Sequence, residues 1–272
     1  MIGSAAPARE LSGDRPLPPR ERLLYLWRNA WRNLRAAGGV PTHRFLTRGI
    51  AAADIKERSP SRFLTDLFIK DRLPRRLPPG PIDMLEIGCG SGSMMRRLAG
   101  LGYRGTYTGV DVGDRFLREH GTPFSATFVQ RDAHLYEPPH PVSLLFSFSA
   151  LEHIERDDAL IARLSGFVKP GGTQLHIVPA AAGLFVYLWH GYRQYTPADL
   201  VRRFGDDIEI FRIGGFGSFL VHFTAITVPE ILLGLSLRRK APNAYARLVL
   251  AGFALDRILP VCPSALAVFK RH

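Results

Sequence analysis

Cysteine is scarce in this chain, and long apolar runs are missing. The 272 residues include only Cys89 and Cys262, and Cys89 lies in a glycine-rich segment that leaves its side chain little freedom to reach a distant partner. A disulfide framework is therefore not expected, and a reducing compartment, the cytoplasm, is favoured. The first twenty residues contain three arginines and four prolines but no apolar stretch, so they are not expected to act as a secretory signal.

Two apolar stretches are candidates for membrane-spanning helices, and neither fits. The near-apolar run 177–189 is shorter than the roughly 20 residues that a span requires. The longer stretch 219–237 has Pro229 and Glu230 near its middle, where a carboxylate is costly. We therefore predict no transmembrane helix.

Acidic residues are scarce in the N-terminal part. Residues 1–80 contain 16 Lys and Arg residues against 7 Asp and Glu residues, whereas the whole chain contains 36 against 24. The Pro, Ala, Gly and Arg content of residues 1–19 predicts a disordered tail. Residues 20–80 are then expected to form a basic helical extension or cap.

Apolar residues recur at helical spacing within this extension. The pattern predicts an amphipathic basic helix from Arg20 to the glycines at 38–39, followed by helices at 51–56 and 61–73. Ser59 is in a suitable position to be the N-cap of the third helix. The apolar side chains of the first helix are Leu23, Leu24, Trp27, Trp31 and Leu34.

Strand and helix patterns alternate from residue 81 onward. This alternation predicts an α/β fold with a seven-stranded, mostly parallel sheet, helices on both faces, and ligands bound beyond the carboxyl ends of the strands. The core domain with this fold is expected over 81–213 and 264–272. The expected strands are 83–87, 106–110, 127–131, 142–148, 173–178, 208–213 and 265–270, and the expected core helices are 93–101, 114–119 and 156–167.

The apolar segment 214–263 is expected to be an insertion between the last two strands. Because loops of this length rarely lack structure, we expect helices around 219–237 and 243–259, the first kinked or divided by Pro229. One interpretation is a helical hairpin packed on the sheet or on another subunit. The other is a hydrophobic lid or membrane-surface patch that presents a lipid-like acceptor.

A glycine-rich turn follows the first core strand. Its glycines, in the segment 85–92, allow close approach of a ligand to the backbone. Ser93 replaces the third glycine of a dinucleotide motif, Glu86 would repel a pyrophosphate, and Asp111 ends the next strand. A ligand with a ribose and an ammonium group, but without phosphates, fits this pattern best.

Five segments in order resemble the class I S-adenosylmethionine-dependent methyltransferases that act on small molecules. The resemblance implies a Rossmann-like fold, S-adenosyl-L-methionine as cofactor and S-adenosyl-L-homocysteine as product. The matching segments are Leu85-Glu86-Ile87-Gly88-Cys89-Gly90-Ser91-Gly92, Thr108-Gly109-Val110-Asp111, Gln130-Arg131-Asp132-Ala133, Ser149-Ala150-Leu151-Glu152-His153-Ile154 and the turn Val168-Lys169-Pro170-Gly171-Gly172.

The resemblance also implies roles for individual residues. Asp111 would hold both ribose hydroxyls, Asp132 would accept from the adenine amino group, and Glu86 would balance the methionyl ammonium. Each acidic residue could instead cap a helix or a turn. The expected cofactor-binding residues are Glu86, Gly88, Cys89, Gly90, Asp111, Val112, Asp132, Ala133 and Phe148.

His153 follows the fourth core strand, so it is the first candidate for the general base that removes a proton from the acceptor. It could equally cap or pack the next helix. Relatives that bind a metal here resemble Glu-x-x-Glu-His, and Ser149 departs from that pattern, so no metal is expected. The secondary candidates for a catalytic role are His134, His190, Tyr192 and Tyr195.

The segment after the fifth strand is expected to line the acceptor pocket. Residues 179–190 are strongly apolar, and residues 192–200 resemble an Arg-x-Tyr-Thr pattern found at the start of the next helix in small-molecule members. Thr196 fits the N-cap of that helix. Arg193 is a candidate for a substrate contact.

These patterns together predict an S-adenosylmethionine-dependent methyltransferase whose acceptor is small, apolar or lipid-like, and methylated at oxygen. Two alternatives stay open: an RNA methyltransferase that uses the basic N-terminal part, and a non-catalytic cofactor-binding scaffold. Peripheral membrane contact and a homodimer are compatible with the sequence. Nucleic acid is not the expected partner.

Overall fold

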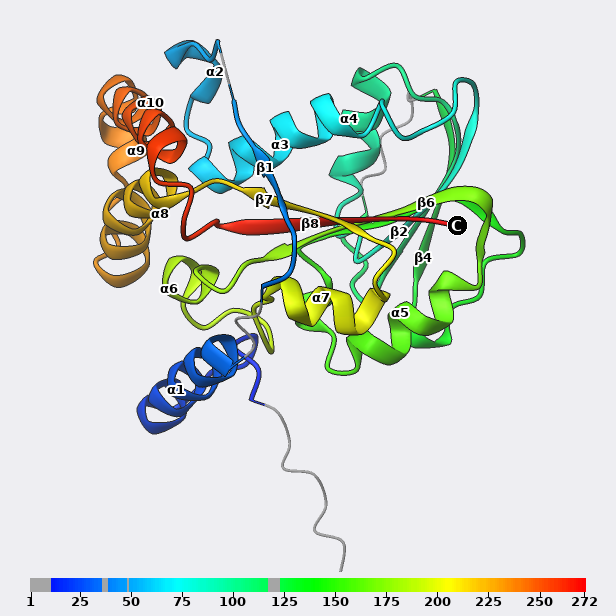
Figure 1. The fold of residues 1–272 in the computed structure, drawn as a ribbon, viewed down its shortest axis with the longest axis horizontal. Helices are drawn as coiled ribbons and strands as arrows, with labels where there is room; N and C mark the ends of the chain where they lie inside the picture. Colours follow the sequence, from blue (N-terminus) through cyan, green and yellow to red (C-terminus); the bar gives the residue numbers. More distant parts are fainter. Residues whose placement is uncertain (1–10, 36–38, 48, 117–122) are drawn as a thin grey trace, which may run out of the picture.

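An eight-stranded sheet forms the centre of the molecule, in the order β1-β7-β8-β6-β5-β2-β3-β4 (Figure 1). The computed structural model describes residues 11–35, 39–47, 49–116 and 123–272. Among these strands only β8 runs against the others. The strands are β1 His43–Phe45, β2 Ile82–Ile87, β3 Gly105–Asp111, β4 Phe124–Gln130, β5 Val142–Phe148, β6 Val168–Pro179, β7 Glu209–Ile213 and β8 Ala265–Arg271.

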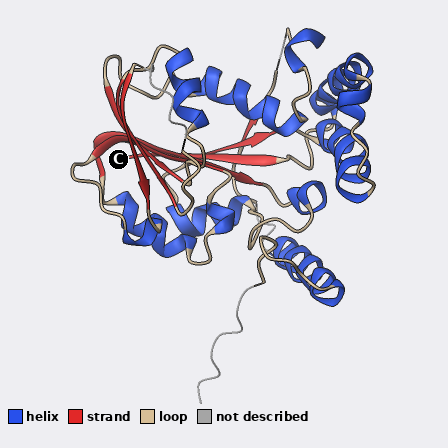
Figure 2. Cartoon of the chain, turned by 180° about the vertical axis from the view of Figure 1, so that it is seen from behind, coloured by secondary structure: helices blue, strands red, loops and turns tan. Residues whose placement is uncertain are grey.

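Helices cover both faces of the sheet (Figure 2). Because side chains alternate across a strand, Met84 and its neighbour Leu85 belong to two different buried clusters, one on each face. One face is covered by α3 Pro60–Arg72 and α4 Ser93–Gly100, and the other by α5 Asp157–Ser165 and α7 Pro197–Phe204.

The predicted α/β class is confirmed, with one strand more than the sequence pattern indicated. Strand β1 has only three residues and pairs in parallel with β7, and Phe45 packs edge-on against Phe68 at a ring distance of 5.2 Å. A segment this short carries no periodicity that could identify it. Within the region expected to form an extension or cap, β1 is therefore part of the sheet and α3 part of its cover, and α2 Ala52–Ile55 lies between them in the chain.

Two predicted core segments differ from the structure. The expected turn 168–172 belongs to β6, because the pairing with β5 shifts between Val142 and Leu144 and the extra residues bulge out of the ladder. Of the expected helix 114–119, residues 114–116 are not helical, and 117–119 lie outside the described residues.

The insertion forms a helical hairpin whose first arm is not divided at Pro229. This arm begins as α8 Phe216–His222 and continues as the π-helical segment η3 Phe223–Leu232. Proline has no N–H and clashes with the carbonyl four residues earlier, and a wider turn accommodates both defects. The chain then forms α9 Leu237–Lys240 and α10 Pro242–Ile258, and α10 packs against α8.

The N-terminal tail is shorter than predicted. Ser12 and Leu17 are buried, and Leu17 packs with Tyr25 and Leu184. These contacts precede the helix α1 Pro19–Arg35. Residues 11–18 therefore lie against the body of the protein, whereas 1–10 are outside the described residues.

No helix in the described ranges is both long enough and apolar enough to cross a bilayer.

Candidate active site

The carboxyl ends of four neighbouring strands form the candidate site. Strand β2 lies between β5 and β3, and β4 follows β3. Ile87 pairs with Val110, and Asp111 pairs with Gln130, so the strand ends are level. The structure therefore brings Glu86, Asp111, Asp132 and Phe148 to one edge of the sheet, as the sequence predicted.

The glycine-rich turn after β2 requires its glycines for two different reasons. Gly88 has a φ of 69°, and a Cβ there would lie 2.4 Å from Cβ of Ala150 in the loop after β5. Gly90 has a φ of 53°, but a Cβ there would meet no atom within 4 Å. The turn is thus packed beneath Gly88 and open above Gly90, where a ligand can approach the backbone.

Asp111 fixes the position of this turn. One of its carboxylate oxygens accepts a hydrogen bond from the N–H of Gly90 at 2.7 Å, and the other accepts from the N–H of Gly113 at 2.8 Å. Each oxygen keeps a further lone pair, which suits two neighbouring hydroxyl groups. Val112, next in the chain, has 73 % of its surface exposed.

Glu86 is almost fully buried, with 3 % of its surface exposed, and accepts a hydrogen bond from the hydroxyl of Tyr107. Burial, with a smaller contribution from the negative charge of Asp111, raises the pKa of Glu86 to about 8, although the hydrogen bond from Tyr107 opposes the shift. Burial also raises the pKa of the Cys89 thiol, to about 12, so this thiol stays protonated. A positively charged ligand group beside Glu86, such as an ammonium group, would favour the charged form of this carboxyl.

Asp132 caps the short helix η1 Ala133–Leu135 by accepting a hydrogen bond from the N–H of His134 at 2.8 Å. Its side chain is exposed, whereas Ala133 is buried. The capping interpretation and the adenine-binding interpretation are compatible, because the cap occupies only one of the two carboxylate oxygens.

His153 lies in the short helix η2 Leu151–His153 and has an acidic partner that the sequence did not indicate. Its Nδ1 lies 2.8 Å from the carboxylate of Asp14. Burial opposes protonation of His153, but the hydrogen bond to Asp14 and the carboxylates of Glu152 and Asp14 outweigh it and raise its pKa. Asp14 is held in turn by the N–H of Gly191 at 3.2 Å.

A second histidine and a buried carboxylate complete this cluster. The ring of His190 meets that of His153 edge-on at 4.5 Å. Glu152 is fully buried, its Oε1 lies 3.9 Å from Nε2 of His153 and 3.6 Å from Nε2 of His190, and neither of its oxygens has a hydrogen-bond partner among the described residues. Ligand atoms of Asp14, His153 and His190 lie within 4.8 Å of one another and could hold a metal ion.

Tyr195 and Arg193 have structural partners. The Tyr195 hydroxyl donates to Asp157 at 2.7 Å, and Arg193 donates to Asp157 and to the carbonyl of Glu155 at 2.6 Å. Both side chains thereby fix the chain that follows His153. Neither arrangement points to contact with a substrate.

The segment before α7 confirms the predicted helix start. Thr196 and Asp199 form a capping box, in which the Thr196 hydroxyl accepts from the Asp199 N–H and the Asp199 carboxylate accepts from the Thr196 N–H at 3.0 Å. Tyr192 donates its N–H to the carbonyl of Glu152 at 2.7 Å. The segment after β6 is thus tied to the segment that carries His153.

Known proteins resemble this chain mainly around the glycine-rich turn. Residues 84–172 match the family model described as "Methyltransferase domain". An uncharacterized methyltransferase of Mycobacterium tuberculosis is 33 % identical over 123 residues, which cover 43 % of this chain and 61 % of that protein. A ubiquinone biosynthesis O-methyltransferase of Thiobacillus denitrificans is 26 % identical over 104 residues, which cover 36 % of this chain and 44 % of that protein.

Among solved structures, a SAM-dependent methyltransferase from Archaeoglobus fulgidus has the same fold, with a TM-score of 0.52 and 17 % identity over 81 % of this chain and 98 % of that one. Residues 84–172 therefore match a methyltransferase domain, and the fold is that of the class I S-adenosylmethionine-dependent methyltransferases. S-adenosyl-L-methionine, the predicted cofactor, is the methyl donor that this class of protein uses. The matched segment spans less than two thirds of the length of either curated relative.

Proposed function

We propose that this protein transfers a methyl group from S-adenosyl-L-methionine to an oxygen atom of a small, apolar or lipid-like acceptor. The observation that carries the proposal is the Asp14–His153 pair at the same strand edge as the glycine-rich turn. An apolar segment that includes α6 Gly183–Tyr187 follows β6 and suits an apolar acceptor. The T. denitrificans relative is named for O-methylation in ubiquinone biosynthesis.

The cofactor-binding residues of the proposal are those expected from the sequence. The Asp111 oxygens would accept from the ribose hydroxyls, Asp132 from the adenine amino group, and Glu86 would balance the ammonium. Val112, Ala133 and Phe148 are the apolar residues proposed to lie beside the adenine and the methyl-bearing sulfur. The backbone of the open turn, at Gly88, Cys89 and Gly90, would approach the methionyl part.

His153 is proposed as the general base. S-adenosyl-L-methionine supplies a methyl group that is already activated on a sulfonium, so the protein has to align the acceptor, exclude water and remove one proton. The Nε2 atom of His153 would take the acceptor hydroxyl proton as the oxygen–methyl bond forms and the sulfonium–methyl bond breaks, which leaves a neutral thioether. Asp14 accepts from Nδ1–H and stabilises the resulting imidazolium.

A labelled-methyl assay tests this proposal. With cell extract that includes the lipid fraction as the acceptor source, label is expected in the organic phase. His153→Ala is expected to lower turnover by roughly 10²- to 10⁴-fold while calorimetric affinity for the cofactor is unchanged. His140→Ala, an exposed histidine outside the site, is the matched control.

The Asp14→Asn variant distinguishes a role of Asp14 in positioning His153 from a role in folding alone. Because Asp14 raises the pKa of His153, its loss is expected to move the acidic limb of the kcat/KM profile to lower pH, besides lowering kcat. Full turnover in His153→Ala would eliminate His153 as the base. Loss of activity on treatment with a chelator would show that the Asp14, His153 and His190 cluster holds a metal instead.

The other interpretations give different results in the same assay. Label on RNA, with binding that falls steeply as salt rises, would identify a nucleic-acid methyltransferase. Tight cofactor binding without label in any fraction would identify a scaffold. We also propose a cytoplasmic location at a membrane surface, which suits an apolar acceptor and two free cysteines.

A further inference from the structure

The helix α1 faces the body of the protein with its polar side. The inward side chains are Tyr25, Asn29 and Asn33, all buried. The Tyr25 hydroxyl donates to the carbonyl of His190 at 2.7 Å, and Arg32 donates to the carbonyl of Gln194 at 3.0 Å. These hydrogen bonds, together with the packing of Tyr25, Leu26 and Ala30 near Leu184, hold α1 in place.

The apolar face of the same helix points to solvent. We name this face, made of Leu23, Trp27, Trp31 and Leu34, the outer stripe of α1; its members are three or four residues apart and so lie in one row. The exposed fraction is 70 % for Leu23 and 67 % for Trp27. The rings of Trp27 and Trp31 stack at 6.1 Å. An exposed apolar row of this size indicates a partner surface.

Arginines flank the outer stripe and identify the chemistry of that partner. Helix α1 contains five arginines and a single acidic residue, Glu21. Arg28 and Arg35 form no ion pair within the described part of the chain, and Arg35 lies over the Trp31 ring at 4.5 Å. Cations beside tryptophan and leucine are typical of helices that lie in the headgroup region of an anionic bilayer.

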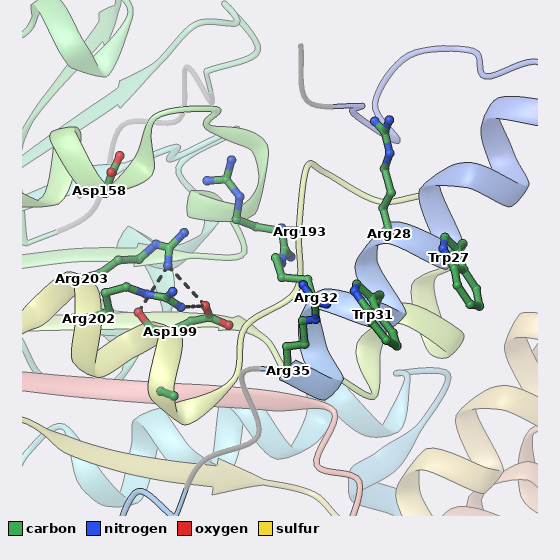
Figure 3. Close-up of a pocket in the computed structure, with 11 residues that line it drawn as sticks. Trp27, Arg28, Trp31, Arg32, Arg35, Asp158, Arg193, Asp199, Arg202 and Arg203 are labelled. Carbon is green, nitrogen blue, oxygen red and sulfur yellow. Dashed lines mark hydrogen bonds and ion pairs between the residues drawn. The ribbon is translucent and has the colours of Figure 1, made fainter. Parts of the chain in front are cut away.

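A basic cavity adjoins the stripe (Figure 3). It has a volume of about 850 Å³ and lies between α1 and α7. Asp158 and Asp199 also line the cavity, and Asp199 is paired with Arg202. The buried Asp157 pairs with Arg193 and Arg203, so the cations offered to a ligand include Arg28 and Arg35 of α1. Such a cavity suits a phosphate group. Its basic lining residues are Arg28, Arg32, Arg35, Arg193, Arg202 and Arg203.

A second apolar and basic element lies at the same end of the molecule. The turn between η3 and α9 exposes leucine side chains and is followed directly by the basic run 238–240. In both views α1 and the hairpin of α8 and α10 project beyond the sheet on one side (Figures 1 and 2). Two such elements suit a flat surface. The exposed apolar residues are Ile231 and Leu232 at the end of η3 and Leu233 and Leu235 in the turn.

We propose that α1 docks on an anionic membrane surface, with its outer stripe in the headgroup region and lipid phosphates in the arginine-lined cavity. This inference does not require methyl transfer, so it can fail or hold independently of the proposed reaction. The occupant is a bilayer rather than a second copy of the chain, because the basic flank of the stripe would meet an identical basic flank across a two-fold axis.

Flotation of the full chain with vesicles tests the proposal. Binding is expected to vesicles of phosphatidylcholine with phosphatidylglycerol, to weaken with salt, and to be weaker with phosphatidylcholine alone. The double variant Trp27→Ala, Trp31→Ala is expected to partition onto the vesicles roughly 10- to 100-fold more weakly. Both side chains are exposed, so circular dichroism should be unchanged.

Two double variants that lose the same charge distinguish the effect of the α1 arginines on vesicle binding from the effect of the net charge of the protein. Arg28→Gln with Arg35→Gln is expected to lose most binding to anionic vesicles. Arg75→Gln with Arg104→Gln removes the same charge from exposed positions near the amino ends of the strands, and should retain it. Equal loss in both pairs, or no flotation of the unaltered protein, would overturn the proposal. A dimer in sedimentation velocity that the tryptophan variant dissociates would overturn it as well.

Discussion

Glu86, which is proposed to balance the cofactor ammonium, also affects the stability of the fold. Its carboxyl is enclosed by protein, hydrogen-bonded to Tyr107 and close to Asp111. Without a cation nearby, the protein favours the uncharged acid. Ligand binding and protonation at this position are therefore linked.

The first residue-scale prediction concerns pH. The pKa of Glu86 is about 8 in the folded protein and 4.5 ordinarily. Between these values the unfolded chain has released a proton that the folded protein retains, so the free energy of unfolding contributed by Glu86 falls as pH rises. Glu86→Gln should remove that decline. Urea unfolding between about pH 5 and about pH 8 measures it, and parallel slopes for both proteins would contradict the prediction.

The second residue-scale prediction concerns the glycine-rich turn after β2. Gly88→Ala and Gly90→Ala both place a side chain at positive φ, but only the first also brings Cβ to 2.4 Å from Ala150. Gly88→Ala should therefore lower the free energy of unfolding by roughly 1–3 kcal/mol more than Gly90→Ala. Urea denaturation without ligand provides the comparison. Equal stabilities would show that the loop after β5 yields to the added methyl group.

At the scale of elements, polar contacts contribute to the attachment of α1. Tyr25→Phe removes the bond to the His190 carbonyl and the one received from Gln194 at 3.1 Å. The longer bond from Gln194 to the same carbonyl, at 3.4 Å, remains, so the loss should cost about 1 kcal/mol. Trypsin should then cleave within α1 faster than in the unaltered protein.

Tyr103→Phe is the control for this prediction, because the buried Tyr103 hydroxyl has no hydrogen-bond partner among the described residues. It makes the same chemical change without the loss of a bond. Similar cleavage rates in the two variants would show that the Tyr25 hydroxyl does not hold α1.

The elements that could be predicted from the sequence are those that carry a periodic pattern or a cap. Strand β5 and the start of α3 at Ser59 and Pro60 follow the expected positions. Strand β1 is too short for a pattern, and β6 begins early because a bulge disguises its first residues. The π-helical segment could not be anticipated, since propensity rules describe only the ordinary helix.

At the scale of the whole molecule, cofactor binding should stabilise the fold. At 100 times its dissociation constant, the cofactor should add about 2.7 kcal/mol, or roughly 5–10 °C in Tm. Asp111→Asn should weaken binding by roughly 10- to 100-fold and so remove about half of that shift or more. Asp114→Asn, an exposed neighbour of the same charge, should retain it. Differential scanning fluorimetry decides between these outcomes.

The candidate site was predictable only where its residues follow consecutive strands. Glu86, Asp111 and Asp132 are placed by the order of strands, and the sheet brings them together. Asp14 is 139 residues from His153 and lies in a segment whose composition predicts disorder. No local pattern links it to the site, because the link is a long-range backbone contact at 2.7 Å between Gly13 and Gly191.

A short connection between Asp14 and Pro19 joins the Asp14–His153 pair to the helix α1. Pro19 is the first residue of α1, and Asp14 is the hydrogen-bond partner of His153. Only residues 15–18 separate the partner of the proposed base from the helix proposed to dock on a membrane. Under these two proposals, docking of α1 would be felt at His153 through this short connection, and turnover would depend on the presence of vesicles.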